Sequence, residues 1–139
     1  MENSTKLMYK IGKIFAIIEI VFGVLIEFVC FYGIAEKEKI FQELVNQGYT
    51  QFSSAEEVAA LFIALAIGLI VALVLTILLI YFGNKATKAI GNGEMKPQVL
   101  VLVFSILAGQ VFYFVGAILG MILASKKPTN QQPTQEIQQ

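Results

Sequence analysis

The chain has 139 residues, of which 57% are hydrophobic and only 14% are charged. A soluble domain carries about a quarter charged residues, and a chain this short forms one small domain whose core cannot hide so much apolar surface. The composition therefore predicts a protein that uses lipid as part of its solvent. Because the formal net charge is zero, nothing indicates a nucleic-acid partner.

Histidine is absent from the sequence, and Cys30 is the only cysteine. A disulfide within the chain is therefore impossible, and a zinc-type ligand set cannot be assembled, so we expect neither a metal nor a cofactor. The Ser–His and Cys–His pairs that activate most nucleophiles are missing too. We predict that the chain is not an enzyme.

The first apolar stretch covers residues 11–35. It exceeds the ~20 residues with which a helix crosses the ~30 Å hydrocarbon core of a bilayer. A cleaved signal peptide is the alternative, because lysines precede the stretch. However, the apolar run is longer than the ~7–15 residues of a signal-peptide core, and it contains Glu19 and Glu27. We predict a transmembrane helix that is retained.

Residues 36–57 are predicted to form an outer loop with an amphipathic helix from about 35 to 47. Gly48 is expected to end this helix. The sequence Ser54-Ala55-Glu56-Glu57 then matches a capping box and predicts the start of the next long helix. The apolar face of the short helix would lie against lipid or against the other helices. That face consists of Ile40, Phe41, Leu44 and Val45.

A second transmembrane helix is predicted over residues 58–83, followed by a lysine-rich loop over residues 84–98. The third apolar stretch, residues 99–124, is long enough for one more helix. We favour that interpretation, which makes the chain an all-α integral membrane protein with a small bundle of three transmembrane helices. The alternative breaks the stretch near Gly109-Gln110 into a hairpin of two short helices, giving four.

The placement of lysines sets the orientation of transmembrane helices. The N-terminal segment 1–10 and the second loop are lysine-rich, whereas the outer loop has five glutamates and two lysines. We therefore predict a multi-pass protein of a bacterial cytoplasmic membrane with its N-terminus inside. A single third helix would place Lys126 and Lys127 outside, against this tendency, whereas a hairpin would not. The tail, residues 125–139, is predicted to be disordered.

Each predicted span carries small residues at a helical spacing, which lets membrane helices approach closely. In the second helix they recur at every fourth position, and we call this set the small-residue ladder. We favour packing within the chain as its role, with a homodimer face as the alternative. The ladder consists of Ala60, Ala64, Gly68, Ala72 and Thr76, and the small positions of the other two spans are Gly12, Ala16, Gly23, Gly109, Gly116 and Gly120.

Polar residues inside the predicted spans fall at two depths. Counted at ~1.5 Å per residue, Glu19, Thr76 and Ser105 share a level near the cytoplasmic side. Glu27 and Gln110 share a level close to the midplane, where a charged carboxylate costs about 2.5–3.5 kcal/mol. Burial favours the protonated carboxyl, which could hydrogen-bond to Gln110. These side chains either hold helices and a partner protein together or take part in transport of protons or ions.

A resemblance to a known group of proteins rests on the first-helix carboxylate, the acidic outer loop, Asn84-Lys85 and a glycine-rich last span that ends in Lys126-Lys127-Pro128. Over residues 5–128 the chain resembles the small multi-pass membrane proteins of low-GC Gram-positive bacteria that are grouped under a domain of unknown function. The resemblance implies a lysine-rich end after the last span, which supports the hairpin. It implies no catalytic or binding residues.

Two classes of function follow from these features. The first is an interaction protein or accessory subunit, with an envelope-stress or immunity-like role, whose partners are the lipid bilayer and either another membrane protein or a second copy of the chain. The second is an oligomeric carrier or channel subunit that uses Glu19 and Glu27. The second class requires oligomers, because three helices leave little room for a pathway.

Overall fold

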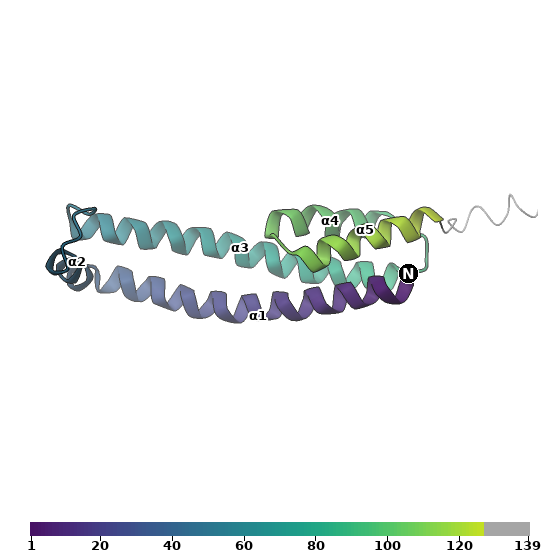
Figure 1. The fold of residues 1–139 in the computed structure, drawn as a ribbon, viewed down its shortest axis with the longest axis horizontal. Coiled ribbons are helices and arrows are strands. Elements are labelled where there is room, and N and C mark those ends of the chain that lie inside the picture. The colour runs from purple at the N-terminus through teal and green to yellow at the C-terminus, as the bar shows by residue number, and fades with distance from the viewer. Residues whose placement is uncertain (127–139) are drawn as a thin grey trace, which may run out of the picture. The chain divides into compact units, whose positions relative to one another are not determined.

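The computed structural model describes residues 1–126, which form five α-helices and no strand. The predicted all-α class is confirmed. Most of the tail that we predicted to be disordered lies outside the described residues, whereas Ser125 and Lys126 belong to the last helix. The helices are α1 (Glu2–Ala35), α2 (Lys37–Asn46), α3 (Ala55–Ala89), α4 (Lys96–Ala108) and α5 (Val111–Lys126) (Figure 1).

The chain divides into two compact units, and both α1 and α3 contribute to each of them. Unit 1 contains Met1–Glu19 and the chain from Leu75 onward, so it holds the start of α1, the end of α3, and α4 and α5. Unit 2 is the segment Ile20–Val74, which holds the rest of α1 and α3 together with α2.

Helices α1 and α3 have 34 and 35 residues and are apolar enough to cross a membrane. Both exceed the ~20 residues that a span requires, and they contain the predicted spans 11–35 and 58–83. Only 17% of the most apolar window of each helix is buried within the protein. The core helix of a soluble protein is mostly buried, so most of this apolar surface has no partner within the described part of the chain.

The prediction of one continuous third helix is wrong, because the chain turns at the position where the alternative placed a break. Gly109 has a φ of +70° and follows the last residue of α4. Its N–H donates to the Ile106 carbonyl (3.3 Å), and the Gln110 N–H donates to the Ser105 carbonyl (2.9 Å). This pair of bonds is a Schellman motif, which closes a helix around a left-handed residue that glycine adopts without strain.

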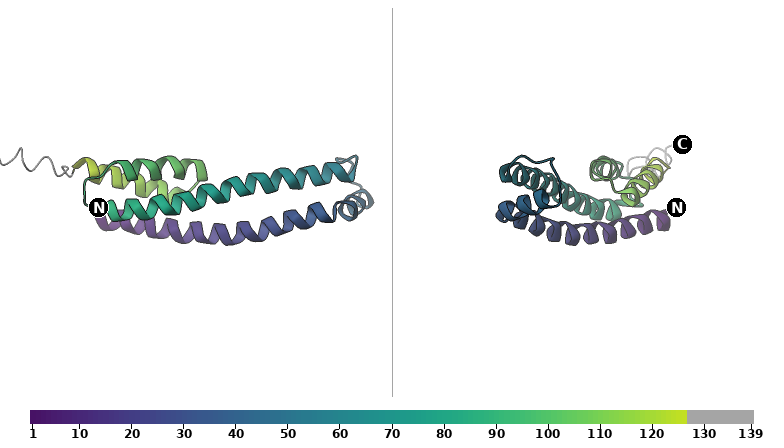
Figure 2. Two further views of the ribbon diagram at one scale, coloured as in Figure 1. Left: turned by 180° about the vertical axis from the view of Figure 1, so that it is seen from behind. Right: turned by 60° about the vertical axis from the view of Figure 1, so that its left-hand side comes forward.

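Helices α4 and α5 pack against each other as a hairpin (Figure 2). They have 13 and 16 residues, which correspond to lengths of about 20 and 24 Å at 1.5 Å per residue. Each is shorter than the ~30 Å hydrocarbon core. Three full spans are therefore not confirmed, and two helices of the described chain have the length and composition of a span.

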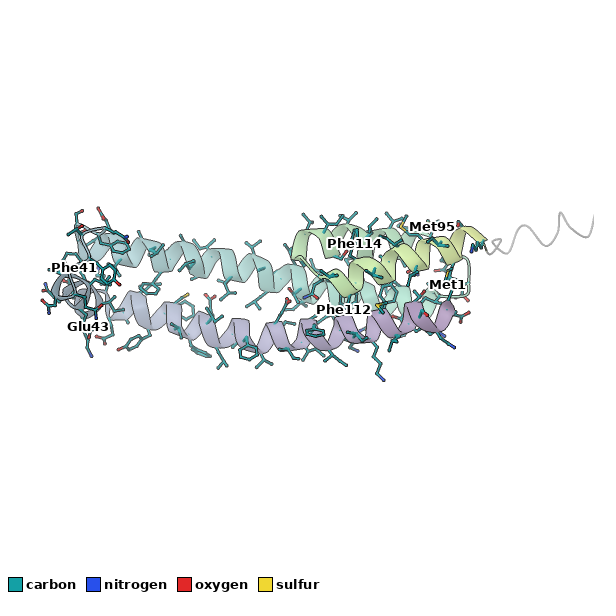
Figure 3. The ribbon with its side chains drawn as sticks, in the orientation of Figure 1. Met1, Phe41, Glu43, Met95, Phe112 and Phe114 are labelled. Carbon is teal, nitrogen blue, oxygen red and sulfur yellow. The ribbon has the colours of Figure 1, made fainter. Side chains whose placement is uncertain are left out.

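The predicted amphipathic helix of the outer loop is α2, and Gly48, two residues after its last residue Asn46, closes it as expected. Gly48 has a φ of +87°, and its N–H donates to the Val45 carbonyl while the Tyr49 N–H donates to the Leu44 carbonyl. This is a second Schellman motif. No residue of α2 is fully buried. Figure 3 labels Phe41 and Glu43 on this helix.

The predicted capping box starts α3, with one difference in its bonds. The Glu57 N–H donates to Ser54 Oγ (3.4 Å), as the motif requires, but the Glu57 carboxylate accepts from the backbone N–H (3.0 Å) and Oγ (2.5 Å) of Ser53. These bonds from the side chain and the backbone of Ser53 lower the pKa of the Glu57 carboxyl. Beside it, Lys37 at the start of α2 forms an ion pair with Glu56 (3.4 Å).

Candidate functional sites

The core of unit 1 is built around two tyrosines that are 2% and 1% exposed, Tyr9 and Tyr113. Their ring centroids are 5.9 Å apart. A methyl group added at Gly12 or Gly83 would lie 2.9 or 2.5 Å from the Tyr113 ring, and one at Gly116 would lie 2.8 Å from the Tyr9 ring. At each of these contacts, a tyrosine ring of one helix therefore packs against a glycine of another helix.

A buried hydrogen-bonded chain connects the helices of this core. The Tyr9 hydroxyl donates to Gln98 Oε1, and Gln98 Nε2 donates to the Ala86 carbonyl (3.0 Å). The Gln98 side chain is 1% exposed and packs against Gly120. These hydrogen bonds connect the start of α1 to α4 and α4 to the end of α3. The contact of Gln98 with Gly120 adds α5 to the same group of helices. Our sequence analysis missed it, because Gln98 stands at the edge of a polar loop and its partners are distant in the sequence.

The predicted polar level of Glu19, Thr76 and Ser105 is only partly assembled in unit 1. Thr76 and Ser105 are buried, at 5% and 1% exposure, and Ser105 Oγ donates to the Leu102 carbonyl (2.7 Å). Glu19 is exposed. Its carboxyl therefore does not enter the core with the two hydroxyls.

Gln110 is the most isolated buried polar group of unit 1. It is 4% exposed, and its Nε2 has no hydrogen-bond partner among residues 1–126. The residue lies in the turn between α4 and α5, beside an open cavity of about 220 Å³. This cavity is lined by Ser105, Ile106, Gly109, Gln110, Val111 and Phe114.

Glu27 is the corresponding isolated group of unit 2. Both carboxyl oxygens are buried and lack a hydrogen-bond partner within the described chain. No lysine occurs at residues 14–36 or 58–84, so these apolar parts of α1 and α3 offer no cation of their own. A cavity of about 100 Å³ is lined in part by Glu27. Its other lining residues are Val24, Phe28, Phe31 and Leu73.

The small residues of α1 accept large side chains of α3 within unit 2. A methyl group at Gly23 would lie 2.6 Å from Leu73, and one at Gly33 would lie 2.7 Å from the Phe62 ring. The glycines of α1 therefore leave the space that the large side chains of α3 fill. Small positions of unit 1 are buried in the same way, namely Gly12, Ala16, Gly116 and Gly120, whereas Gly109 is exposed at its turn.

The small-residue ladder of α3 does not take part in this packing. Four of its five residues, positions 60, 64, 68 and 72, are exposed, whereas Thr76 is buried in unit 1. No atom would lie within 4 Å of a methyl group at Gly68. Within unit 2, α3 turns Phe62 and Leu73 toward α1 and leaves these four small residues exposed. Ala64 and Gly68 line an apolar groove of about 350 Å³. Its other lining residues are Ile26, Cys30, Leu65 and Leu69.

No family model, curated protein or solved structure matches this chain. The resemblance to small multi-pass proteins of low-GC Gram-positive bacteria therefore stays a prediction. Among residues 1–126, no three His, Cys, Asp or Glu side chains gather closely enough to hold a metal ion.

Proposed function

We propose that this chain is an interaction protein of a bacterial cytoplasmic membrane, which works through helix contacts in the bilayer. The exposure of large apolar side chains supports the membrane location. Phe22, Phe28 and Ile67 are 60%, 66% and 58% exposed. Water in contact with such surface costs about 25 cal/mol per Å², and lipid removes that cost.

We propose a cytoplasmic N-terminus, two full spans and a hairpin that enters and leaves the bilayer from the inside. The distribution of lysines within unit 1 supports this topology. Lys6 and Lys10 lie in the first turns of α1, and Lys88 lies in the last turn of α3. The hairpin begins at Lys96 and ends at Lys126, so its two lysines fall on one side, in agreement with the positive-inside tendency.

The exposed part of the ladder, positions 60, 64, 68 and 72, is the observation that carries the proposed interaction. Membrane helices associate where small residues let two backbones come close, since lipid provides no hydrophobic driving force. The occupant is a second copy of the chain. Its own ladder has the same four-residue spacing, so two α3 helices would present complementary faces to each other about a two-fold axis. The groove at Ala64 and Gly68 leaves room for that approach.

Gly68→Leu tests this interface. Because open space surrounds Gly68, leucine would leave the fold of a single chain intact while keeping the two backbones apart. We expect the purified protein to be a dimer in mild detergent and the variant to dissociate at least about tenfold more readily, which corresponds to about 1.4 kcal/mol, because leucine would keep the two backbones from approaching closely. Dissociation would be measured by dilution-dependent energy transfer between labelled copies.

Ile70→Phe is the matched control. It also adds volume at an exposed apolar site, at 49% exposure, but lies about 200° around the helix from Gly68. We expect it to dimerise like the unaltered chain. The proposed interface would be refuted by a monomeric unaltered protein, or by equal dissociation of the two variants.

A second candidate function is an oligomeric carrier or channel subunit, and the isolated carboxyl of Glu27 favours it. A buried carboxyl without a partner inside an apolar span is a candidate for proton or ion movement. Glu27→Gln retains the shape and the hydrogen-bonding capacity but cannot release a proton. We expect it to abolish proton or cation flux in proteoliposomes, with Glu43→Gln on α2 as the control. Flux that is absent from the unaltered protein, or that persists in Glu27→Gln, would exclude this role.

A further inference from the structure

Charged side chains are divided unequally between the two units. The described part of unit 1 contains seven lysines and three glutamates, whereas unit 2 contains two lysines and six glutamates. Lys6 pairs with Glu2 (3.3 Å), but the other six lysines of unit 1 form no ion pair with a carboxylate among residues 1–126. Unit 1 therefore carries positive charge that its own carboxylates do not neutralise.

The buried hydrogen bonds of unit 1 place lysines of three helices at one level. Tyr9 of α1, Ala86 of α3 and Gln98 of α4 are joined by these bonds, and each stands one or two residues from an exposed lysine. At ~1.5 Å per residue, these lysines lie within about 3 Å of that level along their helices. Figure 3 labels Met1 and Met95 at this end of unit 1. We call the set the lysine belt, and it consists of Lys10, Lys85, Lys88 and Lys96.

Lys85 and Lys88 are the members of the belt whose surroundings are best defined. The Lys85 ammonium lies 4.6 Å from the centroid of the Tyr81 ring, in a cation–π contact that directs it toward the apolar part of α3. Positions 77, 81, 85 and 88 share one side of the helix, because they are three or four residues apart. Ile77 and Tyr81 are 53% and 52% exposed. This exposed side thus presents two ammonium groups, then a phenol ring, then an aliphatic side chain.

The same order of groups is found along an anionic phospholipid at the surface of a bilayer. Its phosphate stands outside its acyl chains, as Lys85 and Lys88 stand outside Ile77, and tyrosines favour the boundary between the two regions. The negative surface of a cytoplasmic leaflet attracts clustered lysines. Because the phosphate stays at the hydrated surface, it avoids the cost of a charge in the apolar layer. A zwitterionic phospholipid fits less well, since its own cation is repelled by the lysines.

We propose that the lysine belt binds anionic phospholipids of the cytoplasmic leaflet, with one phosphate held by Lys85 and Lys88 and an acyl chain along Tyr81 and Ile77. The proposal rests on the proposed membrane location and cytoplasmic N-terminus, but not on the small-residue ladder. Gly68→Leu, which tests dimerisation, is therefore expected to leave this lipid preference unchanged.

Phosphatidylglycerol and phosphatidylcholine that carry a spin label on an acyl chain are the probes. The full chain would be reconstituted in phosphatidylcholine vesicles, and electron paramagnetic resonance would measure the fraction of each probe whose motion the protein restricts. Attraction to one surface lysine corresponds to about fivefold, and it is averaged with lipid in contact with uncharged parts of the protein. We therefore expect phosphatidylglycerol to associate at least about twofold more strongly than phosphatidylcholine. At about 1 M salt, where charges are screened beyond ~3 Å, this preference should largely disappear.

Lys85→Gln combined with Lys88→Gln removes both charges while keeping long, polar side chains. Both lysines are exposed, so we expect the helical content to be unchanged and the preference for phosphatidylglycerol to fall by at least about half. Lys37→Gln combined with Lys39→Gln is the matched control, because it removes the same charge from α2 in unit 2. The control should retain the preference of the unaltered chain.

The outcomes separate this inference from the proposed membrane location. If the unaltered chain restricts neither probe, the helices do not enter the bilayer, and both proposals are overturned. If it restricts both probes equally, or if its preference persists at about 1 M salt, the lysine belt does not select anionic lipid. An equal preference in the Lys85→Gln/Lys88→Gln variant and in the unaltered chain would likewise refute the phosphate site on α3.

Discussion

Tyr9 and Gln98 hold a hydrogen bond inside an apolar core, where its loss would leave a buried acceptor without a partner. The Tyr9 hydroxyl is the donor to Gln98 Oε1. The same glutamine gives its amide N–H to the Ala86 carbonyl. Two side chains thus connect helices that are far apart in the sequence. The orientation of the Gln98 amide is fixed by the bond from Tyr9 at one end and the bond to Ala86 at the other.

Tyr9→Phe is expected to destabilise unit 1. The ring would keep its contacts with Tyr113 and Gly116, but Gln98 Oε1 would lose its donor, which costs about 1–3 kcal/mol. The measurement is the free energy of unfolding in mixed micelles. Tyr32→Phe, at a 56% exposed tyrosine, is the control and should change stability by less than about 0.5 kcal/mol. Equal stability of the two variants would mean that the bond contributes nothing.

The role of a single residue was predictable from the sequence only where that role follows from the residue type itself. Gly12 and Gly116 were recognised as close-packing positions, since the lack of a side chain is visible in the sequence. Their partners, the rings of Tyr113 and Tyr9, were not. The isolation of Gln110 was likewise hidden, because the sequence predicts depth along a helix and does not show which polar groups meet.

The C-terminal end of α2 and the start of α3 were predicted well because short-range chemistry determines them. Gly48 closes α2 through bonds within a few residues, and the serines and Glu57 start α3 in the same manner. The third apolar stretch is different. Its hydrophobicity continues across the turn, so length and composition favoured one helix, although Gly109-Gln110 marked the place where the alternative put the break.

The ladder of α3 shows a further limit at the level of elements. Small residues at every fourth position predict a face that allows close approach, and that face exists. Whether α1 packs against this face of α3 or against another depends on where α1 has its own small residues. Gly23 and Gly33 of α1 receive Leu73 and Phe62, and this contact leaves the small residues at positions 60, 64, 68 and 72 exposed. The sequence of α3 alone could not reveal the choice.

The proposed topology of the whole molecule predicts which sites a membrane-impermeant maleimide can reach. On a Cys30→Ala background, cysteines would replace three exposed residues, Gln42, Asn92 and Ser125. We expect Gln42→Cys to react from outside the cell, and both Asn92→Cys and Ser125→Cys to react only in inverted vesicles. Labelling of Ser125→Cys together with Gln42→Cys would instead place the end of α5 outside and contradict a hairpin that returns.

The turn at Gly109 also bears on how the protein reaches its membrane. On the proposed topology, only the connection between α1 and α3 must be translocated during biosynthesis, and residues 36–54 of it carry five charges. The α4–α5 hairpin has no charged residue between Lys96 and Lys126. It could therefore partition sideways into the lipid as a preformed unit, with no polar segment threaded through an insertase.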